Sequence, residues 1–505
     1  MMKKLLFFIL IFNQFFIYAQ KEDAVWVMGY TGTKTGIVED TLFGVTTCDF
    51  SKTNKVFKRD STIHTRFFEN NSSICDTFGS LLMVYNGYDI FNSLLKPMTN
   101  SDSLNKDLES EFPLQQNYTP QGGLILPLPN HKNQYVLLHE QTALWYSSVN
   151  MPEISGFQIF YSIIDMSEEN GLGKVIERRK LLLRDTLDYG KMTAVRHANG
   201  RDWWIVVQEF NAPNYYKILL NPDGVKVADK QKIGIDNYSG LGQALFSPDG
   251  KTYVNMDADI GKKVFTTVFN FDRCTGLLSN PINIPYPIKQ KAWSGGIAIS
   301  PNSKYLYVSL YEHILQYDLS AMDIASTQYV IDTYDGFIDS TANTNTRFFL
   351  ANLAADGKIY ISTMSATRYL HVIHKPNEPK KKCTLEQHGL KLKTFNVNSV
   401  PNYPNFKLGK AENACITSDD DAVVEKVKVK IYPNPSADFI YLEYNKEKLT
   451  HSQLIVNDIQ GRLMLKKNLN DDKIDVHNFL QGIYFLQISK EKKVVFREKI
   501  IVLKH

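Results

Sequence analysis

Side chains with the chemistry to bind a metal ion occur at two places in this sequence. His371 and His374 lie three positions apart in "YLHVIH", a segment typical of a strand, where an odd offset places two side chains on opposite faces. Asp257 and Asp259 in "NMDADIGKKVF" have the spacing of a calcium loop, but the twelfth position is Val268. Valine cannot supply the carboxylate that completes such a loop. We therefore expect no metal at either place, and we interpret the two aspartates as part of a solvated loop.

Aromatic and ionisable side chains also gather in "LLHEQTALWY" and "RHANGRDWW". A cationic and aromatic cluster at a turn has the chemistry to contact a sugar or an anionic group. The alternative, which we favour, is that the tryptophans pack inside the fold and the charged groups cap the turn. The candidate ligand contacts are His139, Glu140, Arg196, His197, Arg201, Trp203 and Trp204.

The common catalytic motifs are missing from the sequence. There is no G-x-S-x-G nucleophile elbow, no P-loop and no H-E-x-x-H zinc motif. The net charge is +4, and residues 425–505 contribute 15 Lys and Arg against 10 Asp and Glu. No dense basic stripe of the kind that binds nucleic acid is present. We predict no catalytic residue, no cofactor, no bound metal and no nucleic-acid partner.

A repeat in the middle of the chain indicates which elements hold these side chains. The segments "ALFSPDGKTYVN", "AISPNSKYLYVS" and "NLAADGKIYIS" each join two strand patterns through a tight turn and a lysine. Asp-Gly turns are typical of hairpins because glycine accepts a positive φ. The turn position is occupied by Lys251, Lys304 and Lys358, and further upstream by Arg201, Lys132 and Ser80.

An interval of about fifty residues with several short strands per unit is typical of a β-propeller. We predict an all-β propeller over residues 22–410, and a β-sandwich, which would alternate more cleanly, ranks second. The six turns give six inner hairpins. We expect a seventh blade built from both ends, with Val25–Tyr30 pairing with Leu392–Val397, and six blades are the alternative. The long interval before Arg201 contains "DMSEENGLGKV", which we expect to be an extended loop.

The turns resemble the repeats of YVTN and WD-like propellers. The segments "SICDTFGSLLMVYNGYDIFN", "TAVRHANGRDWWIVV", "NFDRCTGLLSNPI", "YLHVIHKPN" and "SVPNYPNFKLG" resemble a family of exported propeller-like proteins of bacteria that use type IX secretion. This resemblance covers roughly residues 25–415, and it implies the fold and the export but no activity.

The first residues, "MMKKLLFFILIFNQFFIYAQ", have two lysines followed by an apolar core that is short for a membrane span. We predict a signal peptide over residues 1–19 and no transmembrane segment in the mature chain. An exported chain permits disulfides, and both buried free thiols and one bridge stay open. The cysteines are Cys48, Cys75, Cys274, Cys383 and Cys415.

The last part of the chain has a different pattern. A polar, acidic linker over residues 411–426 precedes seven short strand patterns in residues 427–505, which predict a small Ig-like β-sandwich. "YPNPS", "VNDIQGRLM", "LQGIYFLQI" and "EKIIVLKH" closely resemble the type A C-terminal sorting domain of the type IX secretion system. The sorting-motif residues are Tyr432, Pro433, Asn434, Pro435, Gly461 and Gly482.

The sorting resemblance implies that the secretion machinery is a partner. It also implies passage through the periplasm to the cell surface or the medium, with removal of the sorting domain. For the propeller we favour a non-catalytic binding module whose ligand is an extracellular protein or a polysaccharide. The alternative is a hydrolase, lyase or lactonase with its site in the central channel. Fold does not decide between them, because propellers carry both kinds of function.

Overall fold

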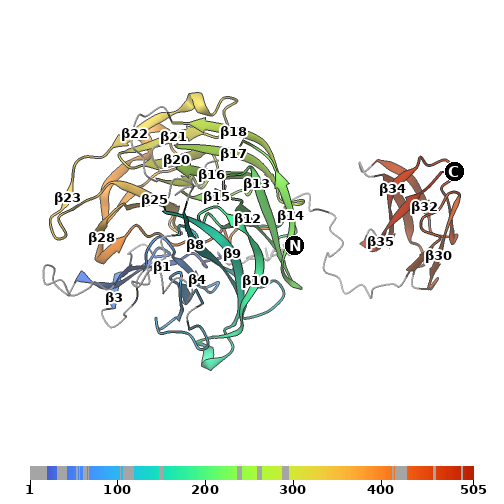
Figure 1. Ribbon diagram of the computed structural model, residues 1–505, viewed down its shortest axis with the longest axis horizontal. Coiled ribbons are helices and arrows are strands. Elements are labelled where there is room, and N and C mark those ends of the chain that lie inside the picture. The colour runs from blue at the N-terminus through green and yellow to red at the C-terminus, as the bar shows by residue number, and fades with distance from the viewer. Residues whose placement is uncertain are drawn as a thin grey trace, which may run out of the picture. The chain divides into compact units, whose positions relative to one another are not determined.

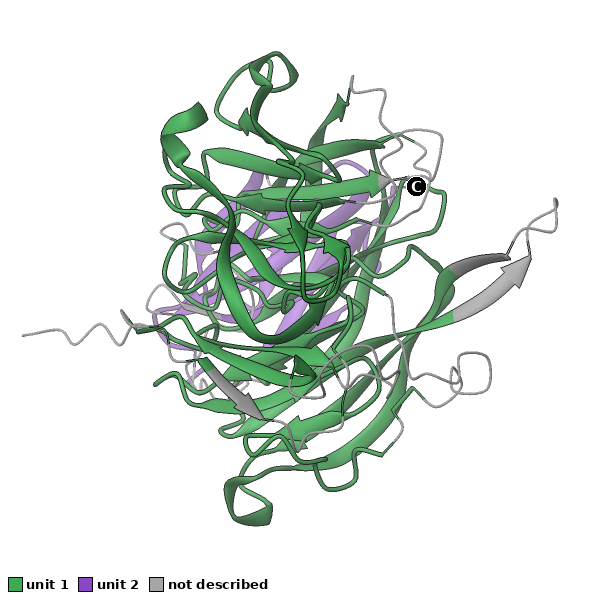
Figure 2. Cartoon of the chain, turned by 90° about the vertical axis from the view of Figure 1, so that its left-hand side faces the viewer, with its two compact units in different colours: residues 1–413 green, residues 414–505 purple. Residues whose placement is uncertain are grey.

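The structure is a computed structural model that describes residues 20–504 except 31–41, 53–54, 56, 61–64, 66, 103, 106–118, 147–151, 236–241, 259–263, 287–294, 412–414, 416–428, 448, 459–461 and 491–492. The predicted signal peptide and most of the predicted linker lie outside the described residues. The chain divides into two compact units, residues 1–413 and 414–505 (Figure 2). Strands dominate both units, so the all-β prediction is confirmed.

The first unit is a succession of antiparallel sheets, each formed by neighbouring strands of the chain. The first sheet contains β1 (Val25–Tyr30), β2 (Gly44–Asp49) and β3 (Phe57–Asp60). The second contains β4 (Ser72–Cys75), β5 (Leu81–Tyr85) and β6 (Ile90–Asn92). The third contains β7 (Gly123–Pro127), β8 (Gln134–Tyr146), β9 (Pro152–Asp165) and β10 (Lys174–Leu187).

Four further sheets have four strands each. The fourth sheet contains β11 (Thr193–Arg196), β12 (Trp203–Gln208), β13 (Asn214–Asn221) and β14 (Gly224–Lys232). The fifth contains β15 (Ala244–Phe246), β16 (Thr252–Ala258), β17 (Val264–Asp272) and β18 (Leu277–Pro285). The sixth contains β19 (Gly295–Ile299), β20 (Tyr305–Leu310), β21 (His313–Asp318) and β22 (Tyr329–Thr333), and the seventh contains β25 (Phe348–Leu353), β26 (Ile359–Thr363), β27 (Ala366–Ile373) and β28 (Leu385–Val397). A short hairpin pairs β23 (Ile338–Asp339) with β24 (Thr344–Asn345).

The sheets follow one another around the first unit in chain order, which gives a propeller-like arrangement (Figure 1). Strands such as β12 and β20 are buried along their whole length, because a strand between two neighbouring sheets has no face toward solvent. Apolar clusters between the sheets, rather than one central core, therefore hold the unit together.

All six predicted inner hairpins are present. Each turn position lies between the first and second strands of its sheet, from β4–β5 to β25–β26. Gly250 and Gly357 have φ of +70° and +77°, and Ser303 takes the same left-handed conformation without being glycine. The turn geometry rather than the glycine is therefore what the repeat preserves.

The long interval before Arg201 has a different cause from the one predicted. "DMSEENGLGKV" is a tight connection that contains a short 3₁₀ turn, Glu169–Gly171, between β9 and β10. The additional residues lie in β8, β9 and β10, which are 13, 14 and 14 residues long. The extended-loop prediction was therefore wrong, because the extra length lengthens a sheet.

The predicted pairing of the two ends is also wrong. Val25–Tyr30 pairs with β2, and β28 pairs with β27. The two ends are nevertheless neighbours: β28 packs against the first sheet, and the Thr46 and Thr394 hydroxyls lie 2.8 Å apart. The other neighbour of β1 is the part of the chain around β4, where the Phe67 amide donates to the Gly29 carbonyl and the Cys75 amide donates to the Glu22 carbonyl.

The second unit contains the seven strands that the sequence predicted. One sheet has β29 (Val429–Tyr432), β30 (Phe439–Tyr444) and β33 (Lys473–Asp475). The other has β31 (Gln453–Asp458), β32 (Leu463–Asn468), β34 (Gly482–Lys490) and β35 (Lys493–Val502). Apolar side chains from both sheets form one buried cluster, as alternating strands with one buried face require.

Candidate functional site

The centre of the first unit is occupied by its own chain. Residues 399–410, which we call the central segment, follow β28 and contact the first strands of most sheets. The Asn402 side-chain amide donates to the carbonyls of Gly123 and Met192, at 2.8 and 3.0 Å. Its oxygen accepts a hydrogen bond of 3.2 Å from Gln121. The Asn402 backbone N–H also donates to the Asn71 carbonyl next to β4, so this one buried residue joins the second, third and fourth sheets.

The following residues of the central segment bind other sheets. The Tyr403 hydroxyl donates to the Leu353 carbonyl at 2.9 Å and accepts from the Trp26 indole at 3.0 Å. The Asn405 side chain donates to the Pro248 carbonyl at 2.7 Å. The segment has no regular secondary structure, so its side chains rather than a backbone ladder hold it in place.

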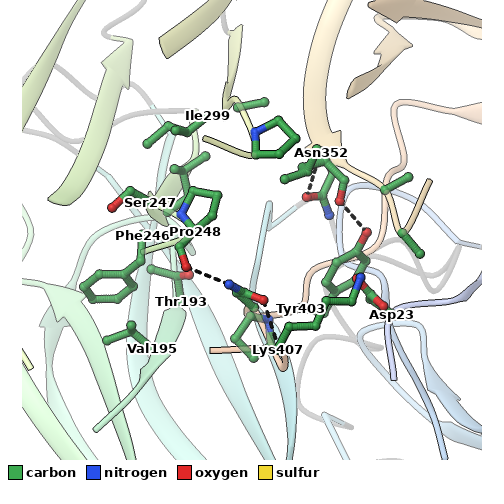
Figure 3. Close-up of a pocket in the computed structure, with 18 of the residues that line it drawn as sticks. Asp23, Thr193, Val195, Phe246, Ser247, Pro248, Ile299, Asn352, Tyr403 and Lys407 are labelled. Carbon is green, nitrogen blue, oxygen red and sulfur yellow. Dashed lines mark hydrogen bonds and ion pairs between the residues drawn. The ribbon is translucent and has the colours of Figure 1, made fainter. Parts of the chain in front are cut away.

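A pocket of about 270 Å³ lies between the central segment and four neighbouring first strands, β11, β15, β19 and β25 (Figure 3). Its wall is formed by apolar groups, including Val195, Phe246, Pro248 and Ile299, and by turn backbone. The pocket opens beside the hairpin turns of the repeat, since Ser247 and Gly357 also line it.

Two charged side chains line this pocket, and they bind each other. The Lys407 ammonium lies 3.3 Å from the Asp23 carboxylate. Burial raises the pKa of Asp23, and the nearby Lys407 opposes that rise. Lys407 is exposed and Asp23 is half-buried, so the pair places a carboxylate with one ammonium partner at the edge of the pocket.

A second, smaller cavity of about 40 Å³ lies deeper, and Glu69, Gln121, Gln243 and Asn402 line it. Glu69 is 6% exposed, and burial raises its pKa to about 7, although the 2.7 Å hydrogen bond from Asn398 opposes the rise. A polar cavity of this size has room for a water molecule.

The candidate pair in "LLHEQTALWY" lies on β8, fully buried. His139 bonds to Asn105 at 2.9 Å and stacks on Phe160, and burial lowers its pKa to about 3. Glu140 accepts a hydrogen bond from the Gly190 amide, and burial raises its pKa well above the ordinary value. Neither side chain lines the pocket beside the central segment.

The candidates in "RHANGRDWW" lie around the β11–β12 turn. Trp203 is fully buried, and the Arg196 guanidinium lies 3.9 Å from its ring centre. Trp204 donates to the Arg273 carbonyl at 3.0 Å, and His197 bonds to the Cys274 carbonyl at 3.1 Å. Arg201 pairs with the neighbouring Asp202 at 2.7 Å. The charged groups therefore bind the turn itself.

The two metal candidates also have structural partners. His371 is buried on β27 and bonds to the Thr346 carbonyl, whereas His374 lies beyond the strand end and pairs with Glu386. Asp259 lies outside the described residues. The solvated-loop prediction is wrong for Asp257, which is fully buried on β16. In the described part of the chain, no three His, Cys, Asp or Glu side chains gather in a way that could hold a metal.

A buried charged group next to Asp257 was missed by the sequence analysis. Lys191 is 1% exposed and pairs with Asp257 and, at 2.8 Å, with Asp188. Both aspartates are fully buried. A lysine in "DYGKM" reads as an ordinary surface residue, and nothing local marks its burial.

The sorting-motif residues of "YPNPS" lie where β29 ends. Tyr432 stacks on Tyr441, and β29 ends at Tyr432, directly before Pro433. The Asn434 side chain donates to the Lys499 carbonyl at 2.7 Å and accepts from the Ile501 amide at 2.9 Å. Asn434 thereby continues the pairing of β35. Gly482 begins β34, and Gly461 lies outside the described residues.

The cysteines resolve the alternative left open by the sequence in favour of a bridge. Cys274 and Cys415 are disulfide-bonded, and Cys48, Cys75 and Cys383 are free and buried.

Within the described ranges, none of the helices has the length and apolar character needed to cross a membrane.

Comparison with known proteins identifies the end of the chain. Residues 430–503 match the family model described as the secretion system C-terminal sorting domain. The chain is also 32% identical over 75 residues to beta-agarase D of Zobellia galactanivorans, a match that covers 15% of each protein. The chain thus spans only a small part of that relative.

Solved structures with a similar arrangement have low sequence identity. A putative 6-phosphogluconolactonase from Bacteroides uniformis is 12% identical, with a TM-score of 0.40, and the match covers 74% of this chain and 98% of that one. PorZ, a surface component of the type-IX secretion system of Porphyromonas gingivalis, is 11% identical with a TM-score of 0.29, over 91% and 73% of the two chains. The Cps50 (Swd1) β-propeller domain of Myceliophteria thermophila is 10% identical with a TM-score of 0.38, over 68% and 94% of the two chains.

Proposed function

We propose that this chain, which ends in a type IX secretion system sorting domain and has a propeller-like first unit, is a non-catalytic binding protein of the cell surface or the medium. The sorting domain implies export by the type IX machinery. The finer statement, that the exported propeller binds a protein or a polysaccharide, is our proposal, and so is its site in the pocket beside the central segment.

The binding proposal rests on the bonding partners of the polar side chains that line the pocket. Asn405 and Tyr403 bind backbone carbonyls, and one carboxylate oxygen of Asp23 pairs with Lys407. Acid–base catalysis needs a titratable group held free to exchange a proton with substrate. Apolar walls with already bonded polar groups instead favour recognition by shape.

The size of the pocket limits what it holds. Its volume of about 270 Å³ lies just below the range of roughly 300–1,000 Å³ for ligand pockets. We infer that it receives one group of a larger ligand, such as one sugar ring of a polysaccharide or one apolar side chain of a protein. The rest of that ligand would lie over the hairpin turns around the opening.

A glycan array and a panel of envelope proteins, probed with the full chain, test this proposal. Ala355 lines the pocket and is half-buried, so Ala355→Trp fills the opening. Ala321→Trp, on a turn that does not line the pocket, is the matched control. We expect Ala355→Trp to weaken binding of the identified ligand by at least about tenfold, or about 1.4 kcal/mol. Equal binding by both variants, or turnover of a glycan or lactone, would overturn the proposal.

The export proposal has a separate test. Deleting residues 427–505 removes all seven strands of the second unit, so the first unit should fold and stay in the periplasm. The full chain in the same cells is the control. Appearance of the shortened protein on the surface or in the medium would contradict the role of the sorting domain.

We also propose a seven-bladed propeller over residues 22–410, followed by the linker 411–426 and a sorting β-sandwich over 427–505. Seven sheets of three or four strands in the described part of residues 22–410 support this count, and the packing of β28 on the first sheet supports closure of the ring. Proteolysis should cut the linker first, because it has few apolar residues to bury. An early cut within residues 22–410 would contradict these boundaries.

A further inference from the structure

A lysine and two aspartates form a closed group inside the first unit. Lys191 lies in the connection before β11, and Asp257 lies on β16 of the next sheet. The Lys191 ammonium contacts an Asp257 carboxylate oxygen and lies 2.8 Å from an Asp188 oxygen. Lys191 is 1% exposed and both aspartates are 0% exposed. Solvent therefore does not compete for the contact between amine and carboxyl.

The surroundings hold the two reacting groups in place. The second Asp257 oxygen accepts a hydrogen bond of 3.2 Å from Asn255. Asp188 accepts a 2.7 Å hydrogen bond from the Tyr189 amide through its other oxygen. Glu140 also faces the group from β8, and its burial raises its pKa well above the ordinary value. The amine and the Asp257 carboxyl thus stay in contact without a search of rotamers.

The group buries an ion pair. A buried ion pair loses the hydration of both ions, and the mutual attraction does not always repay that loss. Burial raises the pKa of Asp257, while the two aspartates raise the pKa of Lys191, so the ammonium must first pass a proton to the carboxylate before the amine can react. Conversion of the pair into an amide would remove both charges from the interior.

We propose that Lys191 and Asp257 condense in the folded protein to form an intramolecular isopeptide bond. The Lys191 ammonium first gives a proton to the Asp257 carboxylate. The neutral Nζ then attacks the Asp257 carbonyl carbon, and the C–N bond forms. Asp188 accepts a proton from the attacking nitrogen and returns it to the departing hydroxyl, which leaves as water. An ammonium and a carboxylate thus become one amide and one water, with no oxidation or reduction.

We assign Asp257, rather than Asp188, as the carboxyl group that reacts with Lys191, and the resulting amide bond would link two sheets. Asp188 is three residues before Lys191 in the same connection and binds the amine from the other side, which suits a proton carrier. The Lys191–Asp257 bond would tie the connection before β11 covalently to β16. An exported protein would gain resistance to local opening between these sheets, in addition to its disulfide. This inference does not depend on the proposed ligand.

Mass spectrometry of the purified full chain tests the proposal. After reduction and denaturation, we expect a mass lower than the sequence predicts by the mass of one water molecule. Trypsin should fail to cut after Lys191, and the digest should contain residues 185–196 joined to residues 252–262. Lys191→Arg keeps the positive charge but cannot form the amide, so it should have the full mass. Asp188→Asn should form the bond more slowly while keeping a similar shape.

The peptide map separates this bond from other losses of water. Dehydration located at Asp249–Gly250 would be a cyclic imide and would overturn the proposal, as would the unchanged mass of the wild-type protein. The wild-type measurement alone decides, so the proposal stays testable even if Lys191→Arg does not fold.

Discussion

The central segment predicts a large and specific cost for one substitution, Asn402→Ala. Asn402 is 6% exposed and takes part in three side-chain hydrogen bonds, with Gly123, Met192 and Gln121. Each buried partner that loses its bond costs about 1–3 kcal/mol. The adjoining polar cavity of about 40 Å³ lets water satisfy part of this loss. We therefore expect the unfolding free energy to fall by about 3 kcal/mol, which is near the lower end of the combined cost of the three lost hydrogen bonds.

The matched control is Asn405→Ala in the same segment. The Asn405 side chain donates to Pro248 and accepts an exposed hydrogen bond from the Lys407 amide, and Asn405 is half-buried, so we expect a loss of about 1 kcal/mol. Urea unfolding followed by tryptophan fluorescence measures both variants, because Trp26 binds the neighbouring Tyr403. If Asn402→Ala is no more destabilising than Asn405→Ala, the central segment does not hold the sheets together as described.

Three other predictions follow from single residues. Burial raises the pKa of Glu69 to about 7, so the folded state holds this proton more tightly than the unfolded chain, and the free energy of unfolding falls as pH rises from about 4.5 through 7. This loss is on the order of 3 kcal/mol at pH 8, and Glu69→Gln should remove it. Urea unfolding measures the pH profile, and a Glu69→Gln profile identical to that of the wild type would contradict this reasoning. Alkylation of the denatured, unreduced chain should label three thiols, Cys48, Cys75 and Cys383, and mass spectrometry that finds five labels would exclude the bridge. Asn434→Ala removes the 2.9 Å hydrogen bond from the Ile501 amide, so hydrogen exchange at Ile501 should accelerate in the full chain, while Asn470→Ala, an exposed turn control, should leave it unchanged.

The sequence predicted the hairpins well because turn chemistry is local. Asp249-Gly250 and Asp356-Gly357 require a left-handed residue within a few positions of two strands, and the structure has it at both glycines. Seven strands of the second unit were predicted for the same reason, since apolar alternation and turn residues lie next to each other in the chain. Such signals say which strands form, but not which sheets pack together.

The role of the central segment in the first unit could not be predicted from such local patterns. "SVPNYPNFKLG" has no period, and its importance depends on carbonyl groups of Gly123 and Met192 that lie more than two hundred positions away. Lys191 likewise has no local sign of burial, because its partner Asp257 belongs to the next sheet. The error about Asp257 had the same origin: an acidic pair in a loop pattern is typical of solvent, and only the fold shows that the strand continues past it.

The central segment also sets the order in which the first unit assembles. Hairpins join strands a few residues apart and form early. By contrast, the Trp26–Tyr403 bond spans 377 positions and the Gly123–Asn402 bond spans 279, and the closing of long loops is slow and unfavourable. These late residues emerge from the ribosome last. Until they arrive, the inner strands display unpaired backbone groups, so a chain that lacks residues 399–410 but keeps the sorting domain should be degraded rather than exported.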